Sequence, residues 1–336
     1  MPSVTAIRTQ PAGLRAGAAG ARIAGPAAAL GLVAEPLLRA DRALRGLVQT
    51  DVSEVPEIAG YLLDAGGKRL RPALTALGAR AIGTEPSPRL MCVGELLHLG
   101  SLLHDDVVDE APTRRGRAAA HRVHGNAVTV LTGDFCLARA VWLAAEEGGH
   151  EAVRTLGETV TQMAEGELLQ LRRAGDLSCS TEQYLDVVAR KSAELISWCA
   201  AAPAWAAERP EDAAALARFG RAVGIAFQIT DDVLDYAEGT GKLPGADLRE
   251  RKVTLPLLLA MERDASLREE LQAAPPAVDD LPAWMERIRA TGALDDARAE
   301  ATRRADRAVR ALGVLPATEG REALALLARY LVERTA

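Results

Sequence analysis

Segments of helical length, separated by turn signals, follow one another from Glu35 almost to the C-terminus, and this pattern constrains the fold more than any other feature. The turn signals are rich in Gly, Pro, Asp and Ser, and they lie at residues 64–72, 83–88, 146–150, 172–180, 207–212, 238–248 and 273–282. No segment between them alternates like a convincing strand. Strong helix formers far outnumber β-branched and aromatic residues, and the aromatic residues are only 3% of the chain. The sequence therefore predicts an all-α protein built as a single large helical bundle.

The predicted domain covers residues 35–336, because no shift in composition divides this part of the chain. Residues 1–34 differ from it, since they hold Arg8, Arg15 and Arg22 but no acidic residue and are rich in Ala and Gly. A segment of this composition cannot bury enough apolar surface to fold alone. We therefore expect a disordered leader at residues 1–34, with a transit peptide or a poor signal sequence as the alternatives.

Composition and charge argue against several classes of protein. A net charge of −6 gives no electrostatic reason to expect nucleic acid as a partner. No apolar run approaches the roughly 20 residues that a membrane-spanning helix needs, so we expect no transmembrane segment. The chain has 4 cysteines, with no CxxC pair and no HExxH motif. Neither a disulfide framework nor a zinc site is expected, and the cytoplasm is the expected location.

Two clusters of aspartates share one spacing. They are "LLHDDVVDE" at residues 102–110 and "QITDDVLDY" at residues 228–236. Residues four apart lie on one helix face, so Asp105 pairs with Asp109, and Asp231 pairs with Asp235. Such like-charge pairs destabilise a helix by a few tenths, about 0.2–0.5 kcal/mol each, which a bound cation would offset. Carboxylate oxygens suit Mg²⁺, which substrate phosphates and water also coordinate.

An acidic, solvated helix face is the alternative interpretation, and for a single cluster it is the better one. Here both clusters follow apolar sequence, "ELLHLGSLLH" in one case and "GIAFQI" in the other, which is unusual for a surface face. Two carboxylate sets facing one cavity could hold several Mg²⁺ ions around a diphosphate. The ions would then neutralise the charge of a leaving group.

Basic residues gather in two further stretches. They are Lys68, Arg69 and Arg71 in "GGKRLRP", and Arg114, Arg115 and Arg117 in "TRRGR". The planar arginine guanidinium matches phosphate oxygens in a way that lysine does not. Neither stretch is a Walker A loop, because the required upstream Gly is missing. Each stretch alone is typical of a solvated turn, but closeness to the aspartates favours a diphosphate site.

Seven stretches in this order carry a family resemblance. They are "GGKRLRP", "LLHDDVVDEAPTRRG", "HGNAVTVLTGDF", "MAEGELLQL", "ARKSAEL", "GIAFQITDDVLDY" and "DLRERKVTLPL". Over residues 35–336 the chain closely resembles the trans-isoprenyl diphosphate synthases, also called polyprenyl synthetases. The resemblance implies a helical bundle of the isoprenoid synthase type with a central active-site cavity. It also implies head-to-tail condensation of isopentenyl diphosphate with an allylic diphosphate, and a homodimer.

The resemblance also implies roles for individual residues. The metal ligands are Asp105, Asp109, Asp231 and Asp235, with Asp106 and Asp232 in support, and the metal is expected to be three Mg²⁺ ions that Mn²⁺ can replace. The isopentenyl diphosphate pocket would contain Lys68, Arg71, His98 and Arg115. The residues that would hold the allylic diphosphate or steady the cation are Arg114, Lys191, Ser192, Gln228, Lys242 and Lys252.

Some of these positions can be assessed without the resemblance. At 100° per residue, His98 and Ser101 fall on the helix face of the first aspartates, although His98 could equally be an ordinary core histidine. Without the resemblance, Lys191 would be interpreted as a helix lysine whose aliphatic chain packs along apolar surface while its ammonium group stays in water. The chain departs from the family pattern at Arg251, where Gly is usual, and at Ser192, where Thr is common.

Two small residues bear on product length. In the resembling family, the residues five and four places before the first aspartate form the floor of the product tunnel, and large aromatics there stop growth early. Here they are Gly100 and Ser101, which predicts an open floor and a long product in the octaprenyl or solanesyl range. The alternative is that Trp142 or Phe135 closes the tunnel sooner, as in a geranylgeranyl or farnesyl diphosphate synthase.

Three rival functions remain as alternatives. A non-catalytic regulatory subunit of a heteromeric prenyl synthase would have lost aspartates or the arginine pair, and this chain has lost neither. A terpene cyclase would not be expected to retain the isopentenyl diphosphate residues. A purely structural helical protein would show no metal-dependent binding of a diphosphate.

Overall fold

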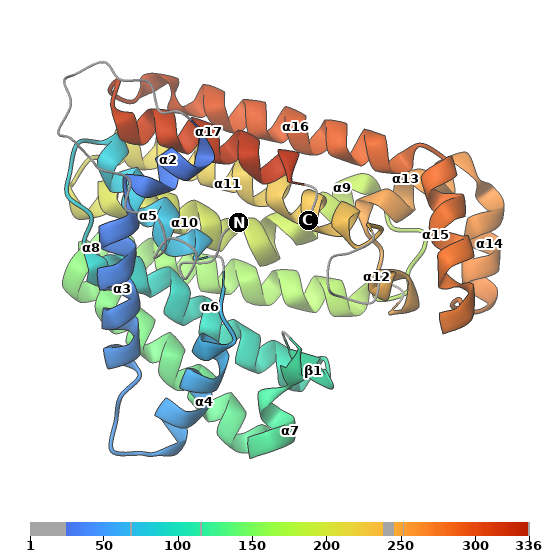
Figure 1. Ribbon diagram of the computed structural model, residues 1–336, viewed down its shortest axis with the longest axis horizontal. Helices are drawn as coiled ribbons and strands as arrows, with labels where there is room; N and C mark the ends of the chain where they lie inside the picture. The colour runs from blue at the N-terminus through green and yellow to red at the C-terminus, as the bar shows by residue number, and fades with distance from the viewer. Residues whose placement is uncertain (1–24, 68, 115, 238–244, 251, 335–336) are drawn as a thin grey trace. The chain divides into compact units, whose positions relative to one another are not determined.

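The computed structural model describes residues 25–67, 69–114, 116–237, 245–250 and 252–334, and these form an all-α fold (Figure 1). The helices are α2 (Pro26–Gly31), α3 (Ala34–Leu47), α4 (Glu54–Asp64), α5 (Leu70–Ala81), α6 (Pro88–Val108), α7 (Ala120–His124), α8 (Asn126–Arg172), α9 (Thr181–Val188), η1 (Ala189–Ala193), α10 (Glu194–Ala206), α11 (Pro210–Leu234), α12 (Ala246–Arg249), α13 (Leu255–Arg263), α14 (Ala265–Ala273), η2 (Val278–Asp280), α15 (Leu281–Ala290), α16 (Ala293–Ala311), η3 (Leu312–Val314) and α17 (Glu319–Glu333). The predicted fold class is confirmed.

The fold begins earlier than expected. Helix α2 starts at Pro26, and Ala29, Leu30 and Val33 are buried. These apolar residues gain enough from burial to order a segment that composition alone assigned to the leader. The predicted leader at residues 1–34 is therefore too long at its C-terminal end, while residues 1–24 lie outside the part of the chain that the structure describes.

A short hairpin is a second difference from the prediction. Strands β1 (Thr113–Arg114) and β2 (Arg117–Ala118) pair antiparallel, with Arg114 opposite Arg117. The loop glycine, Gly116, has φ 76°, the left-handed conformation that tight hairpins require. Two-residue strands are too short to show any alternation, so the sequence carries no signal for them.

The chain forms two compact units, each made of separate segments. Unit 1 contains the described residues up to Leu156 together with Trp198–Leu216 and Leu315–Leu324, and unit 2 contains Gly157–Ser197, Ala217–Val314 and the described residues from Ala325. The segments interleave along the chain, so no single cut in the sequence separates the units. The absence of a composition shift agrees with this, and one domain over residues 35–336 stays a prediction.

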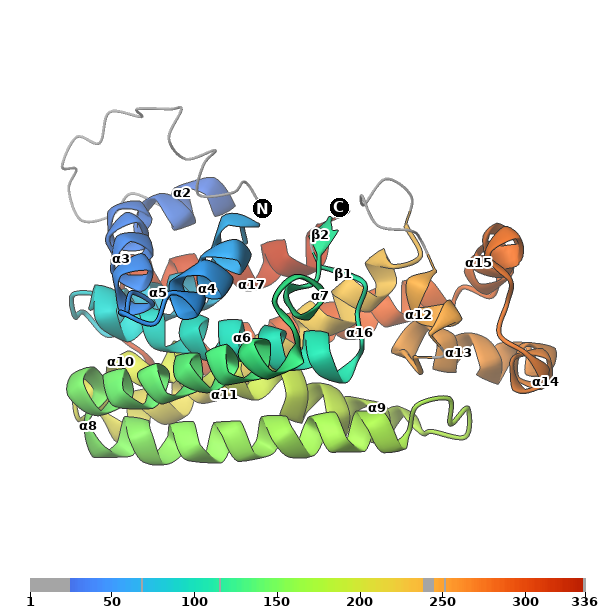
Figure 2. The ribbon, with the colours of Figure 1, turned by 90° about the horizontal axis from the view of Figure 1, so that it is seen from below.

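In unit 1, helix α6 is the central element and packs against α3 and α5. Its core positions are apolar around most of the helix, with Met91, Leu96 and Leu103 fully buried, as expected of a helix enclosed by neighbours. Helix α4 packs against α7, as Figure 2 shows. At Gly94 an added Cβ would lie 2.2 Å from Cys199 Sγ, so the missing side chain lets α10 approach α6 closely.

Helix α8 is interrupted at Gly149, whose φ of 76° is incompatible with a continuous helix. By length and composition alone it could cross a membrane, and 39% of its most apolar window is buried in the fold. One such helix among the described residues is weak evidence for a membrane span, because core helices of globular proteins pass the same test.

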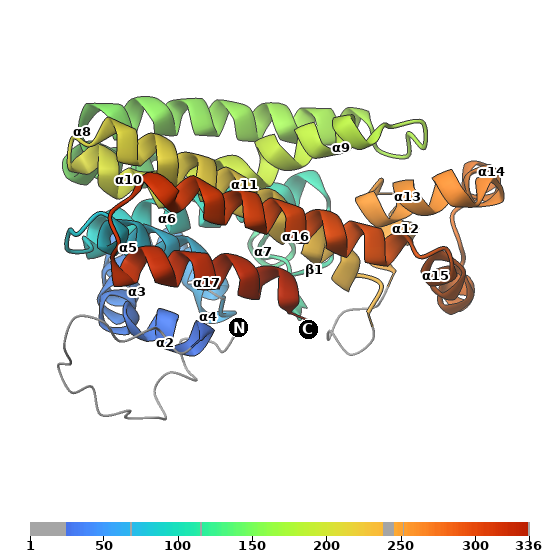
Figure 3. The same cartoon turned by 90° about the horizontal axis from the view of Figure 1, so that it is seen from above.

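In unit 2, the core lies between α9, the second half of α11 and helices α13–α16. Helix α13 packs against α14, α15 and α16 (Figure 3). The guanidinium of Arg289 on α15 donates to the carbonyl oxygen of Tyr236 at 2.6 Å through Nη2, which ties α15 to the chain just after α11. That contact lies beside the second aspartate cluster.

Candidate active site

The first aspartate cluster ends helix α6. Asp105 and Asp106 lie in its last turn, and Asp109 is the first residue beyond it, with its N–H donating to the Asp105 carbonyl at 2.8 Å. Asp105 is partly buried and Asp109 is exposed. The negative end of the helix dipole disfavours carboxylates here, so a cation is the natural counterpart of this arrangement.

The middle aspartate of this cluster is held by the protein itself. Asp106 is fully buried, and its Oδ1 accepts a 2.6 Å hydrogen bond from Nε of Arg114 on β1. Its other oxygen, Oδ2, is buried with no hydrogen-bond partner among the described residues. The hairpin therefore places Arg114 against Asp106, the central carboxylate of the cluster.

The second cluster repeats this plan at the end of α11. Asp231 and Asp232 lie in the last turn, and Asp235 follows the helix with its N–H donating to the Asp231 carbonyl at 3.2 Å. Asp232 is buried, and it accepts from the Tyr184 hydroxyl at 2.6 Å and from Gln228 Nε2 at 2.8 Å. Burial first, and then the negative charge of Asp247, raises the pKa of Asp232 to about 7.

The outer aspartates of the second cluster also have protein contacts. Asp231 forms an ion pair with Arg334, whose buried guanidinium lies 4.4 Å from the ring centre of Phe227. The Oδ2 atom of Asp235 accepts from the backbone N–H of Asp247 at 3.1 Å. Both carboxylates remain partly exposed.

Lys191 and Ser192 lie in the π-helix η1, a form that occurs often at functional sites because it redirects side chains. The Lys191 ammonium lies 2.6 Å from Oε2 of Glu167, and the Ser192 hydroxyl donates to Oε1 of Gln228 at 2.9 Å. Ser192, Gln228 and Asp232 therefore form one hydrogen-bonded chain.

Glycines on two neighbouring helices press against this segment. A Cβ at Gly166 would lie 2.7 Å from Lys191 N, and one at Gly224 would lie 2.6 Å from the Cα of Ala193. Only glycine permits such close contact with backbone, so these two positions fix where Lys191 and Ser192 lie.

Two of the four predicted isopentenyl diphosphate residues, Arg71 and His98, are among the described residues, and both lie in unit 1. Arg71 is on α5, and its Nε is buried with no hydrogen-bond partner among the described residues. Burial lowers the pKa of Arg71, and the nearby Glu95 carboxylate opposes this. His98 is partly buried on α6. Lys68 and Arg115 lie outside the described residues.

The remaining predicted substrate-binding residues are two lysines, Lys252 and Lys242. Lys252 is 45% exposed, and its Nζ lies 3.7 Å from Asp247 and 3.3 Å from Glu250. Lys242 lies outside the described residues, in the stretch 238–244.

Gly100 does not face an open space, contrary to the prediction of an open tunnel floor there. It is buried against α8, where an added Cβ would lie 2.8 Å from the Gly133 carbonyl oxygen. Its small size therefore serves contact between helices. Ser101 is partly buried and donates to the His98 carbonyl at 2.9 Å. Trp142 is 42% exposed and stacks with Arg89 and Arg139, so in this chain it does not close an interior tunnel.

The four outer aspartates of the two clusters suit a hard divalent cation, because carboxylate oxygens are the donors that such ions prefer. Among the described residues, no three His, Cys, Asp or Glu side chains gather closely enough to hold a metal ion by themselves. The first cluster belongs to unit 1 and the second to unit 2. Their convergence on one chamber stays a prediction.

The sequence does not reveal several residues that hold the predicted site residues in place. Tyr184, Glu167 and Arg334 contact Asp232, Lys191 and Asp231, respectively. They are distant in sequence from their partners, and no local motif marks them. In the sequence Arg69 is one of three basic residues in "GGKRLRP", whereas in the structure its side chain is only 10% exposed and forms two ion pairs.

Comparison with known proteins assigns the class. Residues 52–288 match the polyprenyl synthetase family. The chain belongs to this family, which confirms the predictions of a polyprenyl synthetase and of a trans-prenyltransferase.

Individual relatives are similar over nearly their whole length. An octaprenyl diphosphate synthase from Escherichia coli is 38% identical over 315 residues, which cover 90% of this chain and 97% of the relative. The crystal structure of a polyprenyl synthase from Caulobacter crescentus CB15, complexed with calcium and isoprenyl diphosphate, has a TM-score of 0.87 at 38% identity and covers 94% of this chain and 100% of that one. A decaprenyl diphosphate synthase from Rhodobacter capsulatus has a TM-score of 0.85 at 34% identity, covering 92% and 98%.

Proposed function

We propose that this protein is a magnesium-dependent synthase that condenses isopentenyl diphosphate head-to-tail onto an allylic diphosphate and makes a long all-trans polyprenyl diphosphate. One observation carries the proposal: both aspartate clusters end a core helix in the same way. In each, the middle aspartate is buried and bound by protein donors, and the outer two remain accessible. A solvated acidic face would not need a buried, protein-bound carboxylate at its centre.

The outer aspartates Asp105, Asp109, Asp231 and Asp235 would hold the metal, and three Mg²⁺ ions are expected, with Mn²⁺ as a substitute. When bound, the metal supplies charge neutralisation for the departing diphosphate. The calcium and isoprenyl diphosphate in the Caulobacter structure support a site of this chemistry. Asp106 and Asp232 keep the outer carboxylates in place, because each is fixed by its own hydrogen bonds.

The two substrates are assigned to different sets of residues. Arg71, His98, Lys68 and Arg115 would bind the diphosphate of isopentenyl diphosphate. The set for the allylic diphosphate is Arg114, Lys191, Ser192, Gln228, Lys242 and Lys252. Lys191 and Ser192 are well placed for this role, because η1 is fixed by Gly166 and Gly224.

The reaction breaks the bond between carbon and the diphosphate oxygen of the allylic substrate. The double bond of isopentenyl diphosphate then attacks the resulting allylic cation, and a proton is lost to the departing diphosphate. Positively charged and hydrogen-bonding side chains stabilise the charge that develops on the leaving group, which is the general mode of such electrostatic catalysis.

A product in the octaprenyl to solanesyl range is favoured by the relatives, which include synthases named for octaprenyl and nonaprenyl products. Gly100 no longer supports this length, because it packs against α8. Ser101 remains a candidate chain-length residue.

A homodimer in the cytoplasm is part of the proposal. In unit 1, α8 exposes Leu131 at 65%, Val141 at 40% and Trp142 at 42%. Large exposed apolar side chains on one helix are typical of an interface between subunits. A symmetric dimer is the commonest way to cover such a surface.

The proposal is tested by incubating the purified protein with labelled isopentenyl diphosphate, Mg²⁺ and each allylic primer in turn. Mass analysis of the products should show long polyprenyl chains, while geranylgeranyl or farnesyl diphosphate as the final product would favour the short-chain alternative. Asp105→Ala should abolish turnover and leave the circular dichroism spectrum unchanged. Full activity in that variant, or no product from the wild type alone, would overturn the proposal; no product until a second protein is added would favour the regulatory-subunit alternative.

A further inference from the structure

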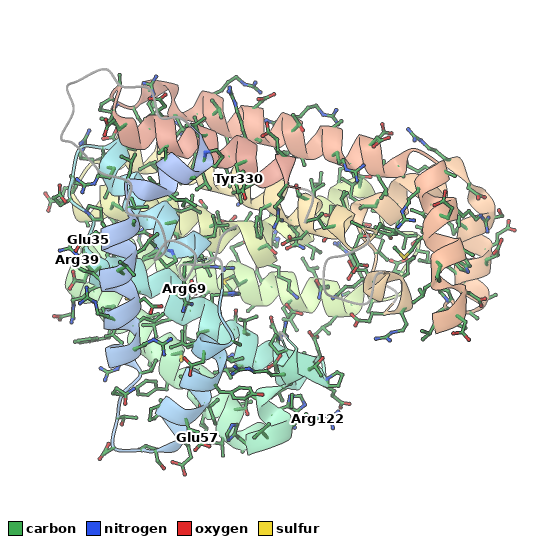
Figure 4. The ribbon with its side chains drawn as sticks, in the orientation of Figure 1. Glu35, Arg39, Glu57, Arg69, Arg122 and Tyr330 are labelled. Atoms are coloured by element: carbon green, nitrogen blue, oxygen red, sulfur yellow. The ribbon has the colours of Figure 1, made fainter. Side chains whose placement is uncertain are left out.

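Arg69 lies in the "GGKRLRP" stretch, between Lys68 and Arg71. Its side chain is only 10% exposed, and it makes two ion pairs. Nη1 lies 2.6 Å from Oε1 of Glu95 on α6, and Nη2 lies 3.1 Å from Oδ1 of Asp41 on α3. Arg69, labelled in Figure 4, therefore ties the start of α5 to two other helices.

The backbone at Arg69 is unusual. With φ 49° and ψ 36° it adopts the left-handed conformation, which residues other than glycine rarely occupy. Such a conformation persists only where surrounding contacts hold it. Here the two carboxylates hold the side chain, and the turn at Arg69 sets the direction in which α5 starts, two residues before Arg71.

Glu95 connects this anchor to the predicted substrate pocket. It lies one helical turn before His98 on α6, so the two side chains share a face. Arg69, Glu95 and His98 also line one small pocket. The charge of Glu95 acts on Arg71 as well, where it raises the pKa against the effect of burial. A single buried carboxylate therefore lies next to Arg69, Arg71 and His98.

We propose that Arg69 is a positioning residue for the isopentenyl diphosphate pocket, because it holds the start of α5, which carries Arg71, against the α6 face that carries His98. The inference rests on the proposed function, which assigns that substrate to Arg71 and His98. Arg69 acts through Arg71 and through the turn it fixes. Loss of its guanidinium leaves Glu95 buried without its ion-pair partner, which is costly and displaces the stretch.

If Arg69 has this role, its loss should affect the KM for one substrate and not for the other. Of the predicted allylic residues, Lys191, Ser192 and Gln228 belong to unit 2, whereas Arg69 belongs to unit 1. Arg114 is also in unit 1, but it is held by Asp106 and not by Glu95 or Asp41. A displaced start of α5 should therefore raise KM for isopentenyl diphosphate and leave KM for the allylic diphosphate almost unchanged. A purely structural residue would change both KM values, or only the melting temperature.

Arg69→Asn is the most informative variant, because asparagine tolerates the left-handed conformation and removes only the ion pairs. Arg69→Lys keeps a positive charge but not the paired donors. Arg80→Gln is the matched control: Arg80 is on the same helix and pairs with Glu85, yet its side chain is 36% exposed. Glu95→Gln keeps the side-chain volume and serves as a second test if Arg69→Asn folds poorly.

Steady-state kinetics on the full-length chain should show a rise of about tenfold in KM for isopentenyl diphosphate in Arg69→Asn, and a change below about twofold for the allylic primer. Arg69→Lys should be intermediate, Glu95→Gln should move in the same direction, and Arg80→Gln should match the wild type. Unchanged isopentenyl diphosphate KM in Arg69→Asn, or equal rises for both substrates, would overturn this inference alone. An inactive wild type would instead overturn the proposed function.

Discussion

The Tyr184 hydroxyl lies 2.6 Å from Oδ2 of Asp232, and both groups are buried. Asp232 would otherwise have a carboxylate oxygen in an apolar core cluster that contains Ile229, Val233 and Tyr236. A buried polar group without a partner costs about 1–3 kcal/mol. Tyr184 therefore fixes the centre of the second aspartate cluster, although it lies 48 residues away in sequence.

Tyr184→Phe is expected to lower the free energy of unfolding by about 1–3 kcal/mol, because it leaves one oxygen of Asp232 without a donor. It should also lower the turnover rate. Of the two side-chain donors that the structure describes on Asp232, only Gln228 then remains. Urea unfolding and initial rates would measure the two effects. Tyr330→Phe on the half-buried face of α17 is the control. Equal stability in the Tyr184 and Tyr330 variants would contradict this role for the hydroxyl.

Gly100→Ala is expected to destabilise the protein by about 1–3 kcal/mol, the usual cost of overpacking. The added Cβ would lie 2.8 Å from the Gly133 carbonyl oxygen, and the backbone there has little freedom to move. Gly60→Ala on α4 is the matched control, since nothing lies within 4 Å of its added Cβ. That variant should gain about 0.5–1 kcal/mol from its better helix propensity. Thermal unfolding of both variants checks this, and a stable Gly100→Ala would mean that α6 and α8 are not so closely packed.

The aspartate clusters could be predicted from the sequence because spacing within a helix is local information. Residues four apart share a face whatever surrounds them. The same argument placed His98 on the face of Asp105. What spacing cannot supply is the partner across the fold. Tyr184 and Arg334 reach their aspartates from 48 and 103 residues away, through tertiary packing that no local pattern encodes.

Gly100 shows how a correct motif can lead to a wrong structural conclusion. The sequence shows that the side chain is small, and a small residue can leave space or admit a neighbour. The two outcomes differ only in what lies opposite, which here is the backbone of Gly133. Helix α2 is a case in which the sequence predicted too little structure. Its apolar residues are ordered because they pack against the rest of the fold, and composition alone does not reveal that surface.

Burial should make three cysteines unreactive in the folded protein. It raises the pKa of the thiols of Cys92, Cys136 and Cys199 to about 12 in each case. The thiolate is the reactive form, so alkylation near pH 8 should be negligible until the chain unfolds. Mass spectrometry after iodoacetamide treatment, with and without denaturant, measures this. Rapid labelling of Cys199 in the native state would show that α10 does not pack against α6 as described.

Asp264 should give part of the stability a measurable dependence on pH. It caps α14, accepting from the backbone N–H of Ser266 at 3.1 Å, and Arg287 Nε donates to it at 2.8 Å. The hydrogen bonds from Arg287 and Ser266 lower its pKa from 3.8 to about 2. A depressed pKa means that the stabilisation is complete above pH 3.8 and is lost as the pH falls toward 2.

Asp264→Asn keeps a capping side chain but removes the charge. Its melting temperature should therefore lie below that of the wild type at pH 6, and the difference should disappear in acid. Asp306→Asn, an exposed change on α16, should leave the melting temperature unaltered. If the difference in melting temperature between the wild type and Asp264→Asn stays constant from pH 6 into the acid range, the charge of Asp264 contributes nothing through its pair with Arg287.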